Sequence, residues 1–229
     1  MRILFPAAAL AALALPVSAG AQSQRPPSVQ ASGSATVSVA PDEARILIGV
    51  ITQASNAAAA ASQNAAQLQK ALDEWKAAAG PKAEVKTVSY SLTPNYDMKS
   101  GARTIRSFTA NDVVQVTTSD LASVGRIVDA ATQSGANEIQ SLQFTLKDPS
   151  QAHAQALRKA ALQAHSEVEA MASALGLKLG KVLALDEAST TPIRPFVAMQ
   201  SAAMAGTPIQ QPQTIDVTAT VTLTIALEQ

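Results

Sequence analysis

Alternating hydrophobic and polar residues mark two segments near the ends of the chain. Apolar or small side chains occupy every second position from Val29 to Val39, with Gln, Ser and Thr between them. The segment from Ile215 to Leu227 repeats this pattern, with Asp and mostly Thr at the intervening positions. A period of two predicts strands with one buried face. An open edge of this length recruits another chain unless it is covered, so we expect the last strand to pair with the first or to mediate self-association.

Apolar residues spaced three or four apart predict two long helices. The first covers 56–79 and ends at Gly80-Pro81, as a Gly C-cap followed by Pro should. The second covers 150–175 and ends at Gly176, and a shorter helix is predicted over 121–133. The expected core-facing stripes are Ala61, Ala65, Leu68, Leu72, Trp75 and Ala79 in the first helix, and Leu157, Ala161, Ala164, Val168, Met171 and Leu175 in the second.

The remaining segments complete an α+β pattern of order ββαββαβαββ. Further strands are predicted over 44–52, 85–95, 104–118, 137–146 and 181–187, with 97–102 as a hairpin loop. This order predicts a mainly antiparallel sheet with helices packed on one face. The stretch from Arg45 to Leu146 has the βαββαβ order of a ferredoxin-like unit. Four prolines between 188 and 213 predict a flexible loop without regular structure.

The first residues have the pattern of a secretory signal peptide. Arg2 precedes an apolar stretch over 7–17, and Ala19-Gly20-Ala21 is a small-x-small cleavage site. We expect cleavage after Ala21, which makes 1–21 the signal peptide. A membrane anchor is the alternative, but the apolar stretch is short for a bilayer.

The rest of the chain then divides simply. Residues 22–28 are expected to be a flexible leader, and 29–229 a single domain. No later segment approaches 18 consecutive apolar residues, so no transmembrane segment is expected. The sequence therefore predicts an exported, periplasmic protein.

Composition narrows the chemistry that is available. The 229 residues include no cysteine, which excludes thiol catalysis, Cys-ligated zinc and iron–sulfur clusters. The 17 basic and 17 acidic residues leave no net charge. A neutral chain lacks the positive field of a nucleic-acid-binding protein, so we expect no nucleic-acid partner.

Four titratable residues are candidates for a metal site or a carboxylate pair. His153 and His165 lie twelve positions apart on one predicted helix, about 120° around its axis. They cannot hold one metal ion together, and we expect both on the flank or surface of the helix. Asp42 and Glu43 are adjacent beside a turn, where neighbouring side chains point to opposite faces. We expect a solvated turn there.

Aromatic residues and nucleophiles give no better candidate. Tyr90, Pro94 and Tyr96 lie on or beside one predicted strand, with Trp75 nearby in sequence. They could form a ligand site, but in a chain with so few aromatics we expect them to serve the core or the hairpin. No G-x-S-x-G motif presents a serine nucleophile.

Two glycines and three methionines complete the search. Gly176 and Gly180 follow a helix instead of preceding one, so they are expected to be a helix stop and a turn, not a phosphate cradle. Met171, Met199 and Met204 could scavenge oxidants as sulfoxides, although methionine is not enriched. We therefore predict no catalytic, cofactor-binding or metal-binding residue and no cofactor.

Four segments of the chain resemble one known family. They are Gly33 to Gly49 (GSATVSVAPDEARILIG), Lys86 to Tyr96 (KTVSYSLTPNY), Phe108 to Phe144, and Leu157 to Glu187. Together they resemble the SIMPL-domain family of the periplasmic immunogenic and oxidative-stress defence type. The most specific pieces are Gly135-Ala136-Asn137 and the Gly-Leu-Lys-Leu-Gly at 176–180. The sequence departs from the family at Phe108, where tyrosine is common, and at Gln213-Thr214, where Gly-Glu is common.

The resemblance implies function only in outline. It implies an exported α+β protein, and one bacterial relative assembles into a large ring-like or channel-like oligomer. Bacterial members are linked to reduced oxidative stress, and no catalytic residues or cofactor are established for the family. We therefore expect a non-enzymatic homo-oligomer of the envelope. The alternatives are an envelope enzyme or ligand-binding protein with an unrecognised site, and an adaptor that binds another envelope protein through 188–213.

Overall fold

A computed structural model describes most of the chain after the N-terminal segment. It describes residues 26–99, 102–188, 193–194, 196–197 and 211–228. The expected signal peptide, most of the expected leader and most of the 188–213 loop lie outside these ranges. The helices and strands are β1 (Ser28–Val39), β2 (Glu43–Ala54), α1 (Ala57–Ala79), β3 (Glu84–Lys99), β4 (Ala102–Thr118), a 3-10 turn η1 (Leu121–Ser123), α2 (Val124–Gln133), β5 (Glu138–Thr145), α3 (Ser150–Ala174), β6 (Lys178–Glu187), β7 (Ile193–Arg194), β8 (Phe196–Val197) and β9 (Ile215–Glu228).

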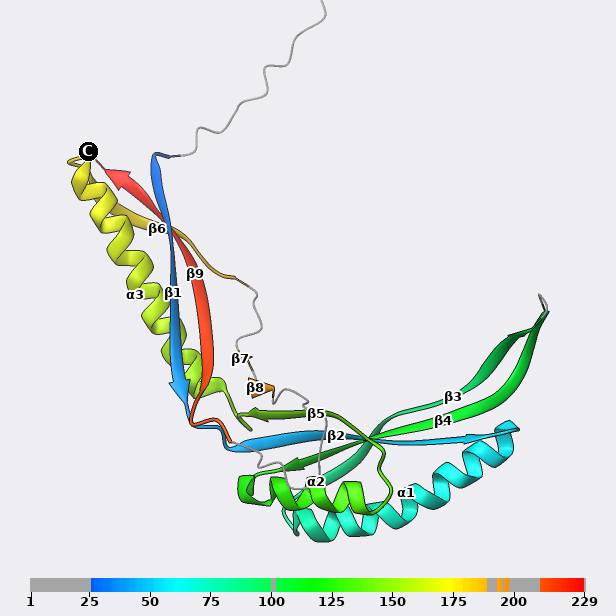
Figure 1. Cartoon of the computed structure of the whole chain (residues 1–229). Coiled ribbons are helices and arrows are strands. Elements are labelled where there is room, and N and C mark those ends of the chain that lie inside the picture. The colour runs from blue at the N-terminus through cyan, green and yellow to red at the C-terminus, as the bar shows by residue number, and fades with distance from the viewer. Residues whose placement is uncertain (1–25, 100–101, 189–192, 195, 198–210, 229) are drawn as a thin grey trace, which may run out of the picture.

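Five strands form what we call the central sheet. Their order is β3-β4-β2-β5-β8, and every neighbouring pair is antiparallel. Helices α1 and α2 cover one face (Figure 1) and enclose the larger core, which includes Trp75, Ile46 and Ile127. The predicted βαββαβ unit, β2 to β5, is confirmed. Its strands lie in the order β3-β4-β2-β5, so the second and fourth strands of the unit flank the first and third, as in a ferredoxin-like fold.

The remaining strands form a second sheet, the terminal sheet, in the order β1-β9-β6 with β7 also beside β9. Pairing of the last strand with the first, one of the two alternatives expected, is confirmed, and the register runs from Ser28↔Ala226 to Val39↔Ile215. Helix α3 covers one face with its alanines. The other face carries cross-strand hydroxyl pairs, such as Ser32 with Thr222 at 3.0 Å and Thr36 with Thr218 at 3.0 Å.

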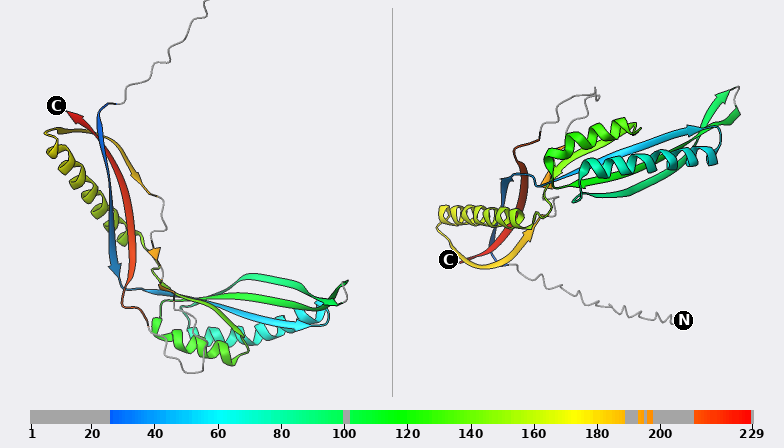
Figure 2. Two further views of the ribbon diagram at one scale, coloured as in Figure 1. Left: turned by 45° about the horizontal axis from the view of Figure 1, so that its top comes forward. Right: turned by 90° about the horizontal axis from the view of Figure 1, so that it is seen from below.

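The α+β class is as predicted, but the strands divide into two sheets where we expected one. Figures 1 and 2 show the two sheets meeting at an angle, each with its helices on one face. The chain leaves the terminal sheet after Val39 and enters the central sheet at Glu43. Pro41 lies between these strands, and proline lacks the N–H that would continue the hydrogen-bond ladder.

The segment expected to lack regular structure contains two short strands. β7 pairs with β9 at Ile193↔Val217, and β8 pairs with β5 at Phe144↔Phe196. Each pairs along only two positions at the side of a sheet, where neighbouring prolines are tolerated. The prolines thus limit strand length without forbidding pairing.

The buried stripe of α3 differs from the predicted one. It is Ala152, Ala156, Ala160, Ala164, Val168 and Ala172. Ala164 and Val168 were predicted correctly, whereas Met171 is 40% exposed and Leu175 is 72% exposed. The helix lies so close to β1 that a Cβ atom on Gly33 would be 2.0 Å from the Ala160 carbonyl oxygen. Only alanine-sized side chains fit this contact.

Candidate functional site

The two histidines lie apart and each contacts a glutamate. His153 Nε2 is 2.9 Å from Glu187 Oε1, which joins the start of α3 to the end of β6. His165 Nδ1 is 4.0 Å from Glu169 Oε2 on the same exposed helix face. Within the described ranges, no group of three His, Cys, Asp or Glu residues is placed to hold a metal ion.

Asp42 and Glu43 act as structural ties at the start of β2. The Asp42 carboxylate accepts a hydrogen bond from the Lys147 N–H at 2.7 Å, and Asp42 N–H donates to the Thr145 carbonyl at 3.1 Å. Glu43 pairs with Arg45 at 2.7 Å and is only 8% exposed. The expectation of a solvated turn is therefore wrong for Glu43, because its partner Arg45 lets the carboxylate be buried at the sheet margin.

The glycines of the Gly-Leu-Lys-Leu-Gly segment have different roles. Gly176 has φ +68° and comes after Leu175, the C-cap of α3, so it is the predicted helix stop. Gly180 lies within β6, so the predicted turn is wrong. A Cβ atom at Gly180 would be 2.6 Å from Glu228 Oε1, which is the end of an exposed side chain that can move aside. Met199 and Met204 lie outside the described residues.

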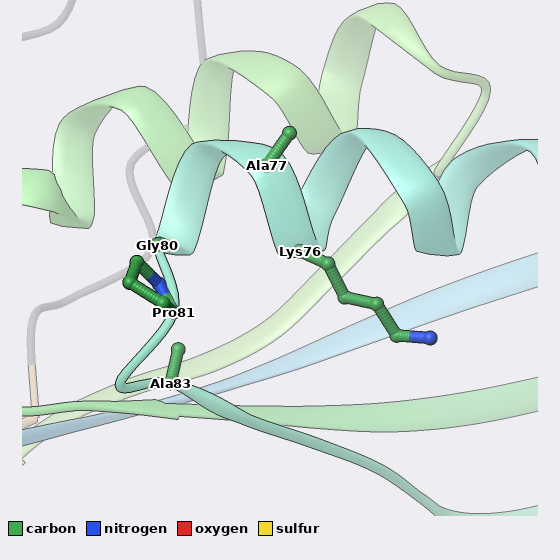
Figure 3. A pocket seen from close by; sticks show the side chains of 5 residues that line it. All are labelled: Lys76, Ala77, Gly80, Pro81 and Ala83. Carbon is green, nitrogen blue, oxygen red and sulfur yellow. The ribbon is translucent and has the colours of Figure 1, made fainter.

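A shallow hollow lies at the C-terminal end of α1 (Figure 3). It has a volume of about 440 Å³ and is lined by Lys76, Ala77, Gly80, Pro81 and Ala83. Lys76 is its one charged group, and Figure 3 shows that side chain extending away from Gly80 and Pro81. A hollow with one ammonium group and no acid, base or nucleophile beside it does not provide a catalytic set.

Asp112 is a buried carboxyl group that the sequence reasoning missed. It lies on β4 between Val50 of β2 and Tyr90 of β3, and the residue is 8% exposed. Burial raises the pKa of the Asp112 carboxyl above its ordinary value of 3.8, because removal from water disfavours the charged form. The sequence signal that could have indicated this buried group is a polar residue between the apolar positions of a predicted strand.

The raised pKa of Asp112 predicts a pH-dependent cost to stability. The folded protein holds the Asp112 proton to a higher pH than the unfolded chain does. The contribution of Asp112 to the free energy of unfolding therefore falls as the pH rises from 3.8 through the raised pKa. We expect Asp112→Asn to raise the free energy of unfolding at neutral pH and to remove this fall. Urea denaturation at a series of pH values measures the difference. Asp129→Asn, at an exposed position of α2, is the control for the loss of one carboxyl group. A stability difference for Asp112→Asn that does not change with pH would contradict the prediction.

The Gly-Ala-Asn segment has a structural role. Gly135 has φ +97° and turns the chain after α2, and Ala136 is buried. The Asn137 side chain then pairs with the backbone of Ile51, accepting from its N–H at 2.9 Å and donating to its carbonyl at 2.6 Å. These two hydrogen bonds continue the pairing of β5 with β2 beyond the last paired residues. The Asn137 amide is therefore already used in stabilising the fold.

Most of the exposed large apolar side chains lie on β6 and on the β3–β4 hairpin, and the others lie on or just after α3. On β6, Val182 is 58% exposed, Leu183 38% and Leu185 59%. On β3 and its partner β4, the exposed residues are Val88, Tyr90, Leu92, Tyr96 and Ile105. In the described part of the chain no strand pairs with the outer edge of β6 or of β3. Clustered exposed apolar groups indicate interaction surfaces, which makes these two strands the candidate functional sites.

Comparison with known proteins finds one family model and several relatives that match the chain. The sequence model of a family described as SIMPL, protein of unknown function (DUF541), matches residues 29–225. The 26 kDa periplasmic immunogenic protein of Brucella melitensis is 27% identical over 174 residues, covering 74% of this chain and 70% of that protein. The uncharacterized protein YggE of Edwardsiella ictaluri is 29% identical over 157 residues, with 68% and 66% covered. YggE of Escherichia coli K12 is 28% identical over 157 residues, which cover 68% of this chain and 63% of that protein.

Proposed function

The chain belongs to the SIMPL family, and we propose that it is an exported, non-enzymatic protein that assembles with copies of itself. The observation that carries this proposal is the open outer edge of β6 with its three exposed apolar side chains. An unpaired edge presents a row of free N–H and C=O groups that a second strand can pair with. The register of β6 against β9 shifts twice, and such irregularities are one way in which proteins protect an edge strand from pairing. The proposal therefore depends on the three exposed apolar side chains and not on the open edge alone.

The charges of β6 favour pairing with a second copy of itself. Lys178 and Lys181 lie toward one end of the strand, and Asp186 and Glu187 lie at the other. When two copies pair antiparallel about a two-fold axis, the basic end of each meets the acidic end of the other. Such an isologous contact is self-complementary in charge as well as in backbone pairing. A ring needs a second contact, for which the outer edge of β3 is open.

We also propose that the chain is exported by a signal peptide cleaved after Ala21. The expected signal sequence supports this, as does the printed name of the Brucella relative, which calls that protein periplasmic. No helix in the described ranges is long and apolar enough to cross a membrane. The intact mass of protein recovered after export of the full chain tests the cleavage position.

The proposal includes a part in defence of the envelope against oxidative stress, as the family resemblance implies. The chain has no cysteine, so such a part rests on the assembled protein and not on thiol chemistry. Met171 is the exposed methionine among the residues whose side chains are described. One thioether on a helix surface is a weak basis for oxidant scavenging.

We expect light scattering of residues 22–229 at micromolar concentration to give a mass above that of one chain. The double variant Val182→Lys and Leu185→Lys should lower this mass, because charges on an edge strand oppose pairing. The matched control is Leu162→Lys on α3, where a leucine is 65% exposed away from any strand edge. The control should keep the assembly. A wild-type monomer at every concentration would contradict self-assembly, and an unchanged mass in the double variant would exclude the β6 edge.

A further inference from the structure

The hairpin of β3 and β4 extends past the end of the central sheet. β2 pairs with β4 as far as Ala54↔Phe108, whereas β3 and β4 continue to pair as far as Lys99↔Ala102. We call 95–99 and 102–107, the part that has no third strand, the hairpin arm. Figures 1 and 2 show it projecting beyond α1 and β2. A projecting two-stranded ribbon can reach a flat surface that the body of the protein does not touch.

One face of the arm continues an exposed apolar strip. Side chains at every second position of a strand share a face, so Tyr90, Leu92 and Tyr96 lie on one face of β3. Ile105 lies directly opposite Tyr96 across the ladder. We call these four residues the apolar strip, and their exposed fractions are 52%, 37%, 43% and 54% in sequence order. No described helix covers this end of the ladder.

Cationic groups lie beside the apolar strip at the end of the arm. The Arg103 guanidinium carbon lies 3.6 Å from the centroid of the Tyr96 ring. Stacking on a ring holds the guanidinium in place while its N–H groups remain able to bind an oxyanion. Arg106 is exposed nearby. The arm sequence carries three basic residues and one acidic residue, although the whole chain has no net charge.

From this placement we propose that the hairpin arm docks on an anionic lipid surface. Tyrosine rings with an apolar body and a polar tip suit the boundary between headgroups and acyl chains. Ile105 adds apolar area beside the ring, and Arg103 and Arg106 meet the phosphates. An acidic protein surface offers charge but no apolar layer beneath it, so the combination of strip and arginines favours lipid. The arm is separate from β6, so lipid docking can be tested apart from assembly through the β6 edge.

Vesicle sedimentation with residues 22–229 tests the proposal. We expect binding to vesicles of phosphatidylcholine mixed equally with phosphatidylglycerol, and little binding to phosphatidylcholine alone. Each basic residue near an anionic surface contributes about fivefold in affinity, so Arg103→Gln with Arg106→Gln should weaken binding roughly 30-fold. Replacing both arginines by lysine should retain most of it. Tyr96→Ser with Ile105→Ser should weaken binding to the same vesicles by removing the apolar contact.

Matched controls separate docking from general effects of charge and exposure. Arg158→Gln with Lys159→Gln removes two exposed cations of α3, and Leu162→Ser removes an exposed leucine there. Both control proteins should bind vesicles as the unmodified protein does. Equal binding to both vesicle types, or equal losses in arm and control variants, would overturn the proposal. Arm variants that lower the oligomeric mass but leave vesicle binding unchanged would assign the arm to a second copy of the chain instead.

Discussion

Gly33→Ala is expected to lower the free energy of unfolding by about 3 kcal/mol, the upper end of the usual cost of overpacking. The added Cβ would lie 2.0 Å from the Ala160 carbonyl oxygen and 2.6 Å from the Ala164 nitrogen. Both are backbone atoms of α3, so no side-chain rotation relieves the clash. The helix must move away from β1, and the contact between its alanine stripe and the terminal sheet opens.

Urea denaturation followed by circular dichroism measures this loss. Gly125→Ala is the matched control, because a Cβ atom there meets nothing within 4 Å and the residue lies in α2. Its stability should be unchanged or higher by up to about 1 kcal/mol, since alanine favours helix over glycine. If Gly33→Ala is as stable as the control variant, α3 does not sit against β1 as described.

Trp75→Ala is expected to cost about 3–5 kcal/mol, the range for removing a large aromatic residue from a core. Trp75 is fully buried on α1, within the core cluster of the central sheet. Its indole N–H also donates to the Ser134 hydroxyl at 2.8 Å, which ties α1 to the end of α2. The substitution removes both the apolar contact and this link between the helices.

Trp75→Phe separates the two contributions. Phenylalanine keeps most of the apolar area and lacks the N–H donor, so we expect a loss of about 1–2 kcal/mol. Circular dichroism is the measurement, because Trp75 is the only tryptophan and its fluorescence disappears in both variants. A loss below about 1 kcal/mol for Trp75→Ala would mean that the core beneath α1 is looser than described.

Strand patterns predicted the fold better than helix patterns did. Alternation in 29–39 and 215–227 correctly indicated two half-buried strands, because a period of two places all the apolar positions on one face. Their pairing with each other was one of the two alternatives that the pattern left open. The prediction of α3 failed at Met171 and Leu175, because side-chain size, and not only hydrophobicity, decided which face approached β1. Close approach depends on Gly33, which lies more than a hundred residues away in sequence.

The hydrophobic pattern of the sequence also could not predict which polar side chains are buried in the core. Asn64 lies outside the stripe predicted to face the core from the first long helix, yet it is fully buried. Its amide donates to the Val50 carbonyl at 2.7 Å and to the Ala110 carbonyl at 3.2 Å. Partners on two different strands become visible only when the helix is placed on the sheet. The candidate surfaces were missed for the same reason: which strand lies outermost depends on pairing, and β6 carries no distinct signal of it.

The pairing of β1 with β9 limits the order in which the two sheets of the molecule can fold. Ser32 and Thr222 are 190 positions apart in the chain and face each other across this ladder. Whether it is synthesised or exported, a chain that emerges from its N-terminus presents β1 and α3 before the strand that lies between β1 and β6. β2 to β5 can meanwhile fold as a contiguous unit. The terminal sheet closes only when β9 is present, and a chain that stops short of β9 leaves the alanine stripe of α3 without one of the two strands that it chiefly packs against.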